Sequence, residues 1–287
     1  MKSYGETLKK IRLSKNYDQS MISGNIIHQS SYSKYELGKI NMTVYKFEKV
    51  LSNLGIDYEE LKFIHHSYNY DAKVAIVTRF NNLKFIDELI LKEIIAASEV
   101  YLKNIEDPQI RDILLVSHGF LAIKKENNFE LASLYADEVW NRLQTLDTWY
   151  LADIRLINSI LFLFKIETAI SISQFAIKQL TKYQALHDYQ KLIYPFKYNL
   201  VQLLIREKNW LGAYQLNEEL IVAFKEEKAY VQIALTYLRK GLLQKKIAME
   251  DEVDFVEKAF EIATVLDDEK LHIQLETERK QILDFIK

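Results

Sequence analysis

Apolar residues recur at three- and four-residue intervals along almost the whole chain, and short polar breaks separate the runs. This spacing places apolar side chains on one face of a helix, whereas strands would show alternation. The pattern therefore predicts an all-α protein. After residue 66 the expected helices are 83–102, 110–123, 129–143, 150–164, 169–180, 192–205, 210–224, 231–243 and 253–266.

The first 66 residues predict five shorter helices. A first helix is expected over 4–13, with Leu8 and Ile11 on its apolar face. The residues that mark the starts of the later helices are polar capping types, and glycine marks two of the ends. The predicted starts are Asp18, Gln29, Thr43 and Asp57, and the predicted ends are Gly38 and Gly55.

The third of these helices lies in the stretch HQSSYSKYELG, residues 28–38, and has a polar front. Glutamine can pair with adenine through two hydrogen bonds, serine can contact several bases, and lysine suits guanine or phosphate. Five short helices with such a third helix favour a helix-turn-helix domain that reads the major groove of double-stranded DNA. The candidate contact residues of this front are Gln29, Ser30, Ser31, Ser33 and Lys34.

Residue composition and charge distinguish residues 1–66 from the rest of the chain and narrow the class of protein. The 287 residues include 2 prolines, 7 glycines and no cysteine, which suits long helices and excludes disulfides and thiolate zinc sites. The net charge of −2 divides unevenly: residues 1–66 carry ten Lys/Arg and seven Asp/Glu, and the remainder carries 28 and 33. The positive part is therefore the part with the predicted reading helix. No apolar run is long enough to cross a bilayer, so we expect a cytoplasmic protein.

Residues 4–64 resemble the lambda-repressor-like, XRE-type DNA-binding domain. The resemblance rests on LKKIR in the first helix, DQ at the second, YSKYELG in the third and LSNLGIDYEEL at the end. It implies a structural ion pair between Arg12 and Glu36, and a buried carboxylate does need such a partner. It also implies a phosphate contact by Gln19 and base contacts by Gln29, Ser30 and Lys34. Further basic residues that either contact phosphate or are merely solvated are Lys10 and Lys15.

The remaining chain predicts a stack of helix hairpins. NNFELASLYADEVW, KNWLGAYQLNEEL and DEVDFVEKAFEIA resemble one another, each with a small residue where two helices would touch. Ala169, Ala213 and Ala259 are 44 and 46 residues apart, longer than the ~34 of a tetratricopeptide repeat. We expect degenerate tetratricopeptide-like hairpins that form a right-handed α-solenoid with a concave face for an extended peptide. Residues 269–287 should close the stack or pair across a dimer.

Two asparagines within apolar helical runs, Asn158 and Asn199, are candidates to hold such a peptide. An asparagine amide can donate to and accept from a peptide backbone at once, and the residue is otherwise a mediocre helix former. A local hydrogen bond between helices is the alternative explanation. Arg155, one turn before Asn158, suits a carboxylate or carbonyl. Weaker candidates are Tyr198, Tyr237 and Arg239, and Arg79 and Phe80 are candidates to couple the peptide to the reading domain.

The whole chain resembles the Rgg/MutR/GadR regulators, on its domain order and on WYLADIRLINSILFLF, YNLVQLLIREKNWLGA and AFEIATVLDDEKLH. The resemblance implies a homodimeric transcriptional regulator controlled by a short signalling peptide. The implied domains are 1–66 for DNA binding, 67–72 as a short join and 73–287 for peptide binding and dimerisation. Some relatives carry a cysteine that bridges the dimer where this chain has Val44, so any dimer is expected to be noncovalent.

We find no motif for an enzyme, a cofactor or a metal. The chain contains no glycine-rich phosphate loop and no recognisable triad. His28, His65 and His66 lack acidic or thiol partners at ligand spacing. Two other interpretations stay open: a protein-interaction scaffold whose N-terminal domain merely docks, and a repressor that has the same reading domain but binds no ligand.

Overall fold

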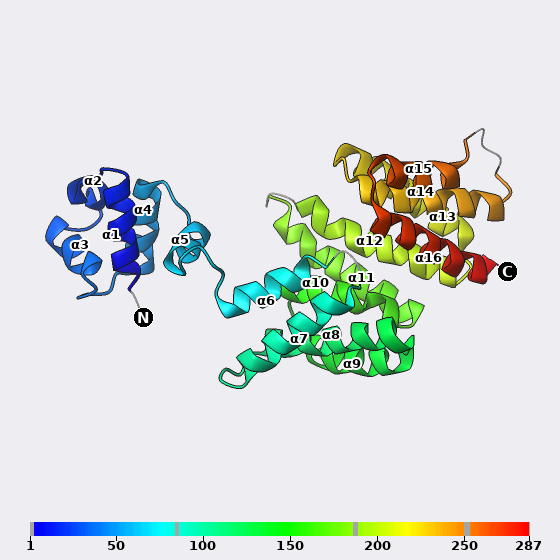
Figure 1. Cartoon of the computed structure of the whole chain (residues 1–287), viewed down its shortest axis with the longest axis horizontal. Helices are drawn as coiled ribbons and strands as arrows, with labels where there is room; N and C mark the ends of the chain where they lie inside the picture. Colours follow the sequence, from blue (N-terminus) through cyan, green and yellow to red (C-terminus); the bar gives the residue numbers. More distant parts are fainter. Residues whose placement is uncertain (1–2, 84–85, 186–188, 250–252, 287) are drawn as a thin grey trace. The chain divides into compact units, whose positions relative to one another are not determined.

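The computed structural model describes residues 3–83, 86–185, 189–249 and 253–286. Within these ranges the chain forms α-helices, two short 3₁₀-helices and no strand (Figure 1). The predicted all-α class is confirmed. None of the described helices combines the length and the apolar character that crossing a membrane would require.

The chain divides into two compact units, one of residues 1–83 with 96–106 and the other of residues 84–95 with 107–287. Helix α7 (Glu88–Leu102) therefore contributes to both units. The other helices of the first unit are α1 (Tyr4–Ser14), α2 (Gln19–Ser23), α3 (Gln29–Glu36), α4 (Val44–Leu54), α5 (Tyr58–His65) and α6 (Ala72–Asn81).

Local signals explain where the helices of the first unit begin and end. The Asp57 side chain accepts a hydrogen bond from the backbone of Glu60 and so caps α5. Gly55 ends α4 in a left-handed conformation, with φ of 64°, which glycine adopts at little cost. Apolar faces of α1 to α5 then meet in one core, whose buried members include Leu8, Ile22, Tyr32, Val50, Leu54 and Leu61.

The segment between α5 and α6 is packed against its neighbours. The Lys62 amine lies 2.7 Å from the Asp71 carboxylate, and Asp71 in turn caps α6. The rings of Phe63 and Tyr70 lie 5.2 Å apart. Residues 67–72, the expected join, thus include side chains that hold α6 to the bundle of α1 to α5. Helix α6 accordingly belongs to the first compact unit. The domain limits at residues 66 and 72 stay a prediction.

The second unit consists of consecutive antiparallel hairpins (Figure 1). Helices α8 and α9, α12 and α13, α13 and α14, and α14 and α15 pack side by side. The bounds are α8 Pro108–Glu126, α9 Phe129–Leu143, α10 Leu151–Ile160, η1 Leu161–Leu163, α11 Ile166–Leu180, η2 Thr181–Tyr183, α12 Tyr189–Arg206, α13 Trp210–Glu226, α14 Tyr230–Lys246, α15 Phe255–Val265 and α16 Glu269–Ile286.

Most of the expected helices differ by a few residues in their limits, and three of the differences have a local basis or mark a change in the helix. The helix expected from residue 83 begins only at Glu88, because the Asp87 side chain accepts hydrogen bonds from the next backbone amides and caps it there. The helix expected over 150–164 ends at Ile160 and continues as the 3₁₀-helix η1. The helix expected from residue 192 begins at Tyr189 and continues through Pro195.

Small residues lie where helices approach closely. Ala132, Ala213 and Ala259 are all fully buried or nearly so, as the repeat pattern requires. In α14, a Cβ added at Gly241 would lie 2.8 Å from the backbone nitrogen of Val256 at the start of α15. Only glycine therefore allows this approach of the two helices.

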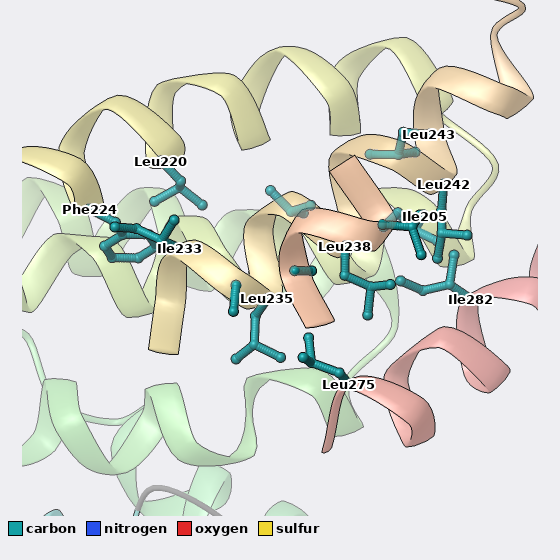
Figure 2. Packing of buried hydrophobic residues seen from close by; sticks show 14 of the residues in the cluster. Ile205, Leu220, Phe224, Ile233, Leu235, Leu238, Leu242, Leu243, Leu275 and Ile282 are labelled. Carbon is teal, nitrogen blue, oxygen red and sulfur yellow. The ribbon is translucent and has the colours of Figure 1, made fainter. Parts of the chain in front are cut away.

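Helix α16 closes the end of the repeat stack. Its Leu275 and Ile282 pack against Leu235, Leu238 and Leu242 of α14 in one buried cluster (Figure 2). The helix also contacts α12 and α15. This is the capping role expected for residues 269–287, of which residue 287 lies outside the described ranges.

Candidate functional site

Helix α3 presents a polar surface to solvent. Its apolar side is fixed by Tyr32, which is fully buried in the core of the bundle. Gln29, Ser30 and Lys34 are exposed, and within the described residues their side chains bond to no protein group. Ser31 and Ser33 are half-buried beside them. The polar front predicted from the sequence is thus available to a ligand, although its contacts with DNA stay a prediction.

A buried ion pair positions this helix. Arg12 of α1 donates from Nε to Glu36 Oε1 at 2.6 Å and from Nη2 to Glu36 Oε2 at 2.9 Å. Gln19 of α2 donates to the same carboxylate at 2.7 Å. Burial raises the pKa of Glu36, but the hydrogen bonds from Arg12 and Gln19 outweigh it and hold that pKa below its usual value. Glu36 therefore joins α1, α2 and α3 as a charged carboxylate.

The Gln19 side chain has a different environment from the one expected. Its amide nitrogen points to Glu36 rather than to solvent, so Gln19 is a structural partner of the ion pair in this structure. Lys15 donates to the carbonyl of Leu54 at 2.7 Å and caps the end of α4. Lys10 is exposed. Of the three, Lys10 alone remains an unengaged candidate for phosphate contact.

Helix ends in the first unit divide into two kinds. The first backbone N–H groups of α1 and α5 are capped by Ser3 and Asp57. By contrast, α2, α3 and α4 have no side-chain cap at their N-termini. Uncapped N–H groups carry a partial positive charge and can bind phosphate oxygens. The N-terminus of α3 is one of these uncapped ends, and the same helix carries the exposed polar side chains.

In the described part of the chain no group of three or more His, Asp or Glu side chains is placed to hold a metal ion. His65 Nδ1 lies 2.8 Å from the Thr7 hydroxyl, and its ring lies 4.3 Å from that of Tyr4. This histidine therefore packs α5 against α1.

In the second unit the two candidate asparagines lie together. Asn199 of α12 donates from Nδ2 to the backbone carbonyl of Asn158 at 3.0 Å and to its side-chain oxygen at 3.1 Å. The hydrogen bond between helices, which the sequence left as the alternative, is therefore present. Arg155 is exposed on α10, one turn before Asn158. A peptide-binding role for these three residues stays a prediction.

Two of the weaker candidates have structural partners. Tyr198 donates from its hydroxyl to Glu278 at 3.3 Å, and burial raises the pKa of this phenol. Arg239 is 1% exposed and pairs with the same carboxylate. Arg239 is therefore buried against α16 rather than exposed on a ligand surface, whereas a peptide contact by the partly buried Tyr198 stays a prediction. The sequence pointed to neither pairing, because Glu278 stands 80 and 39 positions away.

The remaining candidates are placed individually. Tyr237 of α14 lies with its ring centre 5.2 Å from that of Phe255 in α15, so it packs within the α14–α15 hairpin. Phe80 is buried in α6. Arg79, on the same helix, is exposed. Both belong to the first unit, and a coupling role for them stays a prediction.

A helix-turn-helix bundle with an exposed polar third helix, followed by stacked helix hairpins, defines a transcriptional regulator with a helical repeat domain. Residues 96–277, more than half of the chain, match the family described as HTH-type transcriptional regulator Rgg, C-terminal domain. The protein belongs to the Rgg family of transcriptional regulators.

Solved structures share the fold over nearly the whole chain. A putative transcriptional regulator from Listeria monocytogenes EGD-e has a TM-score of 0.72 at 21% identity, covering 98% of this chain and 97% of its own. Bacillus thuringiensis PlcR, in complex with the peptide PapR7 and DNA, gives 0.69 at 18%, covering 98% and 99%. The Streptococcus dysgalactiae SHP pheromone receptor Rgg2 gives 0.68 at 14%, covering 97% and 99%.

Proposed function

We propose that the protein is a cytoplasmic, homodimeric regulator that binds double-stranded DNA through α3 and responds to a short peptide bound at the α10–α12 surface. Its role is regulatory rather than catalytic. The observation that carries the DNA-binding part is the exposed polar front of α3 on a folded helix-turn-helix scaffold. A dimer would be noncovalent, because the chain has no cysteine.

The chemistry of α3 suits base reading at its front. Gln29 begins the helix, where the recognition helix of such domains meets base edges. Lys34 lies further along and offers a positive charge for guanine or phosphate. The buried pair of Arg12 and Glu36 supports this use, because it fixes α3 without drawing on the exposed side chains.

We expect Gln29→Ala to weaken binding to a preferred DNA sequence about ten- to hundredfold, since one bidentate base contact contributes about 1–3 kcal/mol of discrimination. Lys34→Ala should weaken binding as well, and a phosphate contact would also make the salt dependence shallower by about one unit of slope. The measurement is a mobility-shift titration at several salt concentrations, with a duplex selected from random DNA.

Lys103→Ala and Gln215→Ala are the matched controls, because both side chains are exposed away from α3, Lys103 in the turn after α7 and Gln215 on α13. Neither substitution should change DNA affinity. If Gln29→Ala and Lys34→Ala bind the selected duplex like the parent, these residues do not read DNA. If the parent selects no sequence at all, a protein-interaction scaffold becomes the better account.

The peptide-binding part rests on the unused hydrogen-bonding capacity of the asparagine pair. The bond between Asn199 and Asn158 leaves the side-chain N–H donors of Asn158 and the side-chain oxygen of Asn199 without a protein partner in the described residues. An extended peptide backbone offers the complementary pair of groups. The adjacent exposed Arg155 adds a cation that can pair with a peptide carboxylate.

We expect Asn199→Ala to weaken peptide binding by roughly tenfold, because it removes the acceptor and also frees Asn158 to rotate. Isothermal titration calorimetry with short synthetic hydrophobic peptides measures this. Asn141→Ala, an exposed asparagine on α9, is the control and should bind like the parent. Parent protein that binds none of the peptides would favour the ligand-independent repressor, and unchanged binding by Asn199→Ala would place the site elsewhere.

A further inference from the structure

Two charged residues interrupt the apolar contact between α14 and α16. On α14, Arg239 lies among Leu235, Leu238 and Leu242, which all face the buried cluster. On α16, the buried Glu278 lies at helical spacing between Leu275 and Ile282, two members of that cluster. The helical spacing would place apolar side chains at both positions. The chain instead buries one cation and one anion between α14 and the middle of α16.

These two charges and Tyr198 of α12 form one network. Arg239 Nε donates to Glu278 Oε1 at 2.5 Å, and Nη1 donates to the Tyr198 carbonyl at 2.8 Å. The guanidinium lies 3.8 Å from the centre of the Tyr198 ring, whose hydroxyl donates to Glu278 Oε2. Burial lowers the pKa of Arg239, but the charge of Glu278 outweighs it, so that the guanidinium stays charged. Three helices thus meet at one ion pair.

A buried ion pair is a poor choice for stability alone. Desolvation of both charges offsets most of their attraction, and apolar replacements of similar volume are often neutral or stabilising. Its use lies in specificity, because each charge tolerates only the position that leaves the other paired. We infer that Arg239 and Glu278 favour one register of α16 against α14 and α12.

The same network adjoins the proposed peptide surface. Tyr198 and Asn199 are consecutive in α12: Asn199 bonds to Asn158 of α10, and Tyr198 bonds to α14 and α16. We propose that Arg239 and Glu278 are positioning residues that couple α16 to the Asn158–Asn199 pair, so that a change at the pair alters the terminal helix. The peptide as the natural cause of that change rests on the proposed function, whereas the coupling itself does not.

Amide hydrogen exchange of the full-length protein tests the coupling without a peptide. Asn199→Ala should accelerate exchange of the α16 amides about tenfold, because it frees α12 beside Tyr198 and so loosens the network. The same substitution in the Arg239→Met/Glu278→Leu background should change α16 exchange less than twofold. In the Arg239→Met/Glu278→Leu variant, apolar contacts hold α16 against α14. The contacts of Arg239 with the Tyr198 carbonyl and ring are then absent, so a shift of α12 no longer reaches α16 through them.

Two further variants keep the test decisive. Asn141→Ala, away from the pair, should leave α16 exchange unchanged in the parent. If the Arg239→Met/Glu278→Leu variant fails to fold, Glu278→Gln replaces it, because glutamine preserves the side-chain size. In the Glu278→Gln background, Asn199→Ala should accelerate α16 exchange less than threefold. The proposal is wrong if Asn199→Ala leaves α16 exchange unchanged in the parent. It is also wrong if Asn199→Ala accelerates α16 exchange equally in the parent and in the Arg239→Met/Glu278→Leu or Glu278→Gln background. Neither result bears on whether a peptide binds, which the calorimetric titration measures separately.

Discussion

Gly5→Ala should unfold the helix-turn-helix bundle and abolish DNA binding while the repeat domain stays folded. A Cβ at this position of α1 would lie 2.0 Å from the Tyr35 carbonyl oxygen and 2.9 Å from the Tyr35 carbonyl carbon in α3. Backbone atoms cannot move aside as a flexible side chain can, so α1 and α3 must separate. Overpacking typically costs 1–3 kcal/mol, and we expect about 3 kcal/mol or more against backbone.

The location of the tryptophans separates the two units in this experiment. Trp140, Trp149 and Trp210 all belong to the second unit, so their fluorescence reports on the repeats alone. Gly5→Ala should therefore reduce helical circular dichroism and leave the tryptophan unfolding transition in place. Gly119→Ala is the control, because its Cβ would find ordinary contacts of 3.4 Å or more. Unchanged circular dichroism and DNA binding in Gly5→Ala would contradict the close approach of α1 and α3.

Glu36→Ala should destabilise the bundle by about 3–5 kcal/mol, the usual effect of leaving one partner of a buried ion pair uncompensated. Arg12, 6% exposed, would keep its charge inside the protein with only the Tyr17 carbonyl as a hydrogen-bond partner. Urea unfolding followed by circular dichroism measures the loss. Glu48→Ala, an exposed carboxylate on α4, should be close to neutral.

The same pair gives the bundle a defined dependence on pH. The pKa of Glu36 is lowered by folding, so its contribution is fully present above the unfolded value of about 4.3 and disappears as pH falls through the folded value. The parent should therefore lose stability in acid below about pH 4. Glu36→Gln should lack this part of the acid dependence. Equal acid sensitivity in parent and Glu36→Gln would show that other carboxylates govern it.

Much of the first unit followed from local sequence signals. Thr43 and Asp57 directly precede α4 and α5, and Gly55 follows α4 with the left-handed backbone expected of a helix stop. The separation of Tyr32 from the polar front of α3 also followed, because the helical period fixes which residues share a face. These features depend on neighbours within one or two turns.

The contacts that shape the second unit depend on residues far apart in the chain. Asn199 meets Asn158 from 41 positions away, and Tyr198 meets Glu278 from 80. A single sequence shows that such residues are unusual among apolar neighbours, but it does not show which partner each will meet. The sequence therefore makes Arg239 a candidate ligand contact, although the structure buries it in an ion pair. For Lys15 the sequence leaves phosphate contact and solvation open, and it does not reveal that the amine donates to the Leu54 carbonyl at the end of α4.

The contacts of Lys62 with Asp71 and of Phe63 with Tyr70 set a practical rule for domain exchange among related regulators. A hybrid spliced at residue 66 would graft the first five helices onto a foreign α6 and discard both contacts. A splice placed beyond Asn81 carries α6 along with its native partners. Hybrids of the second kind should keep the helix-turn-helix bundle unchanged. They are therefore better suited to testing which peptide a foreign repeat domain recognises, with a known promoter as the readout.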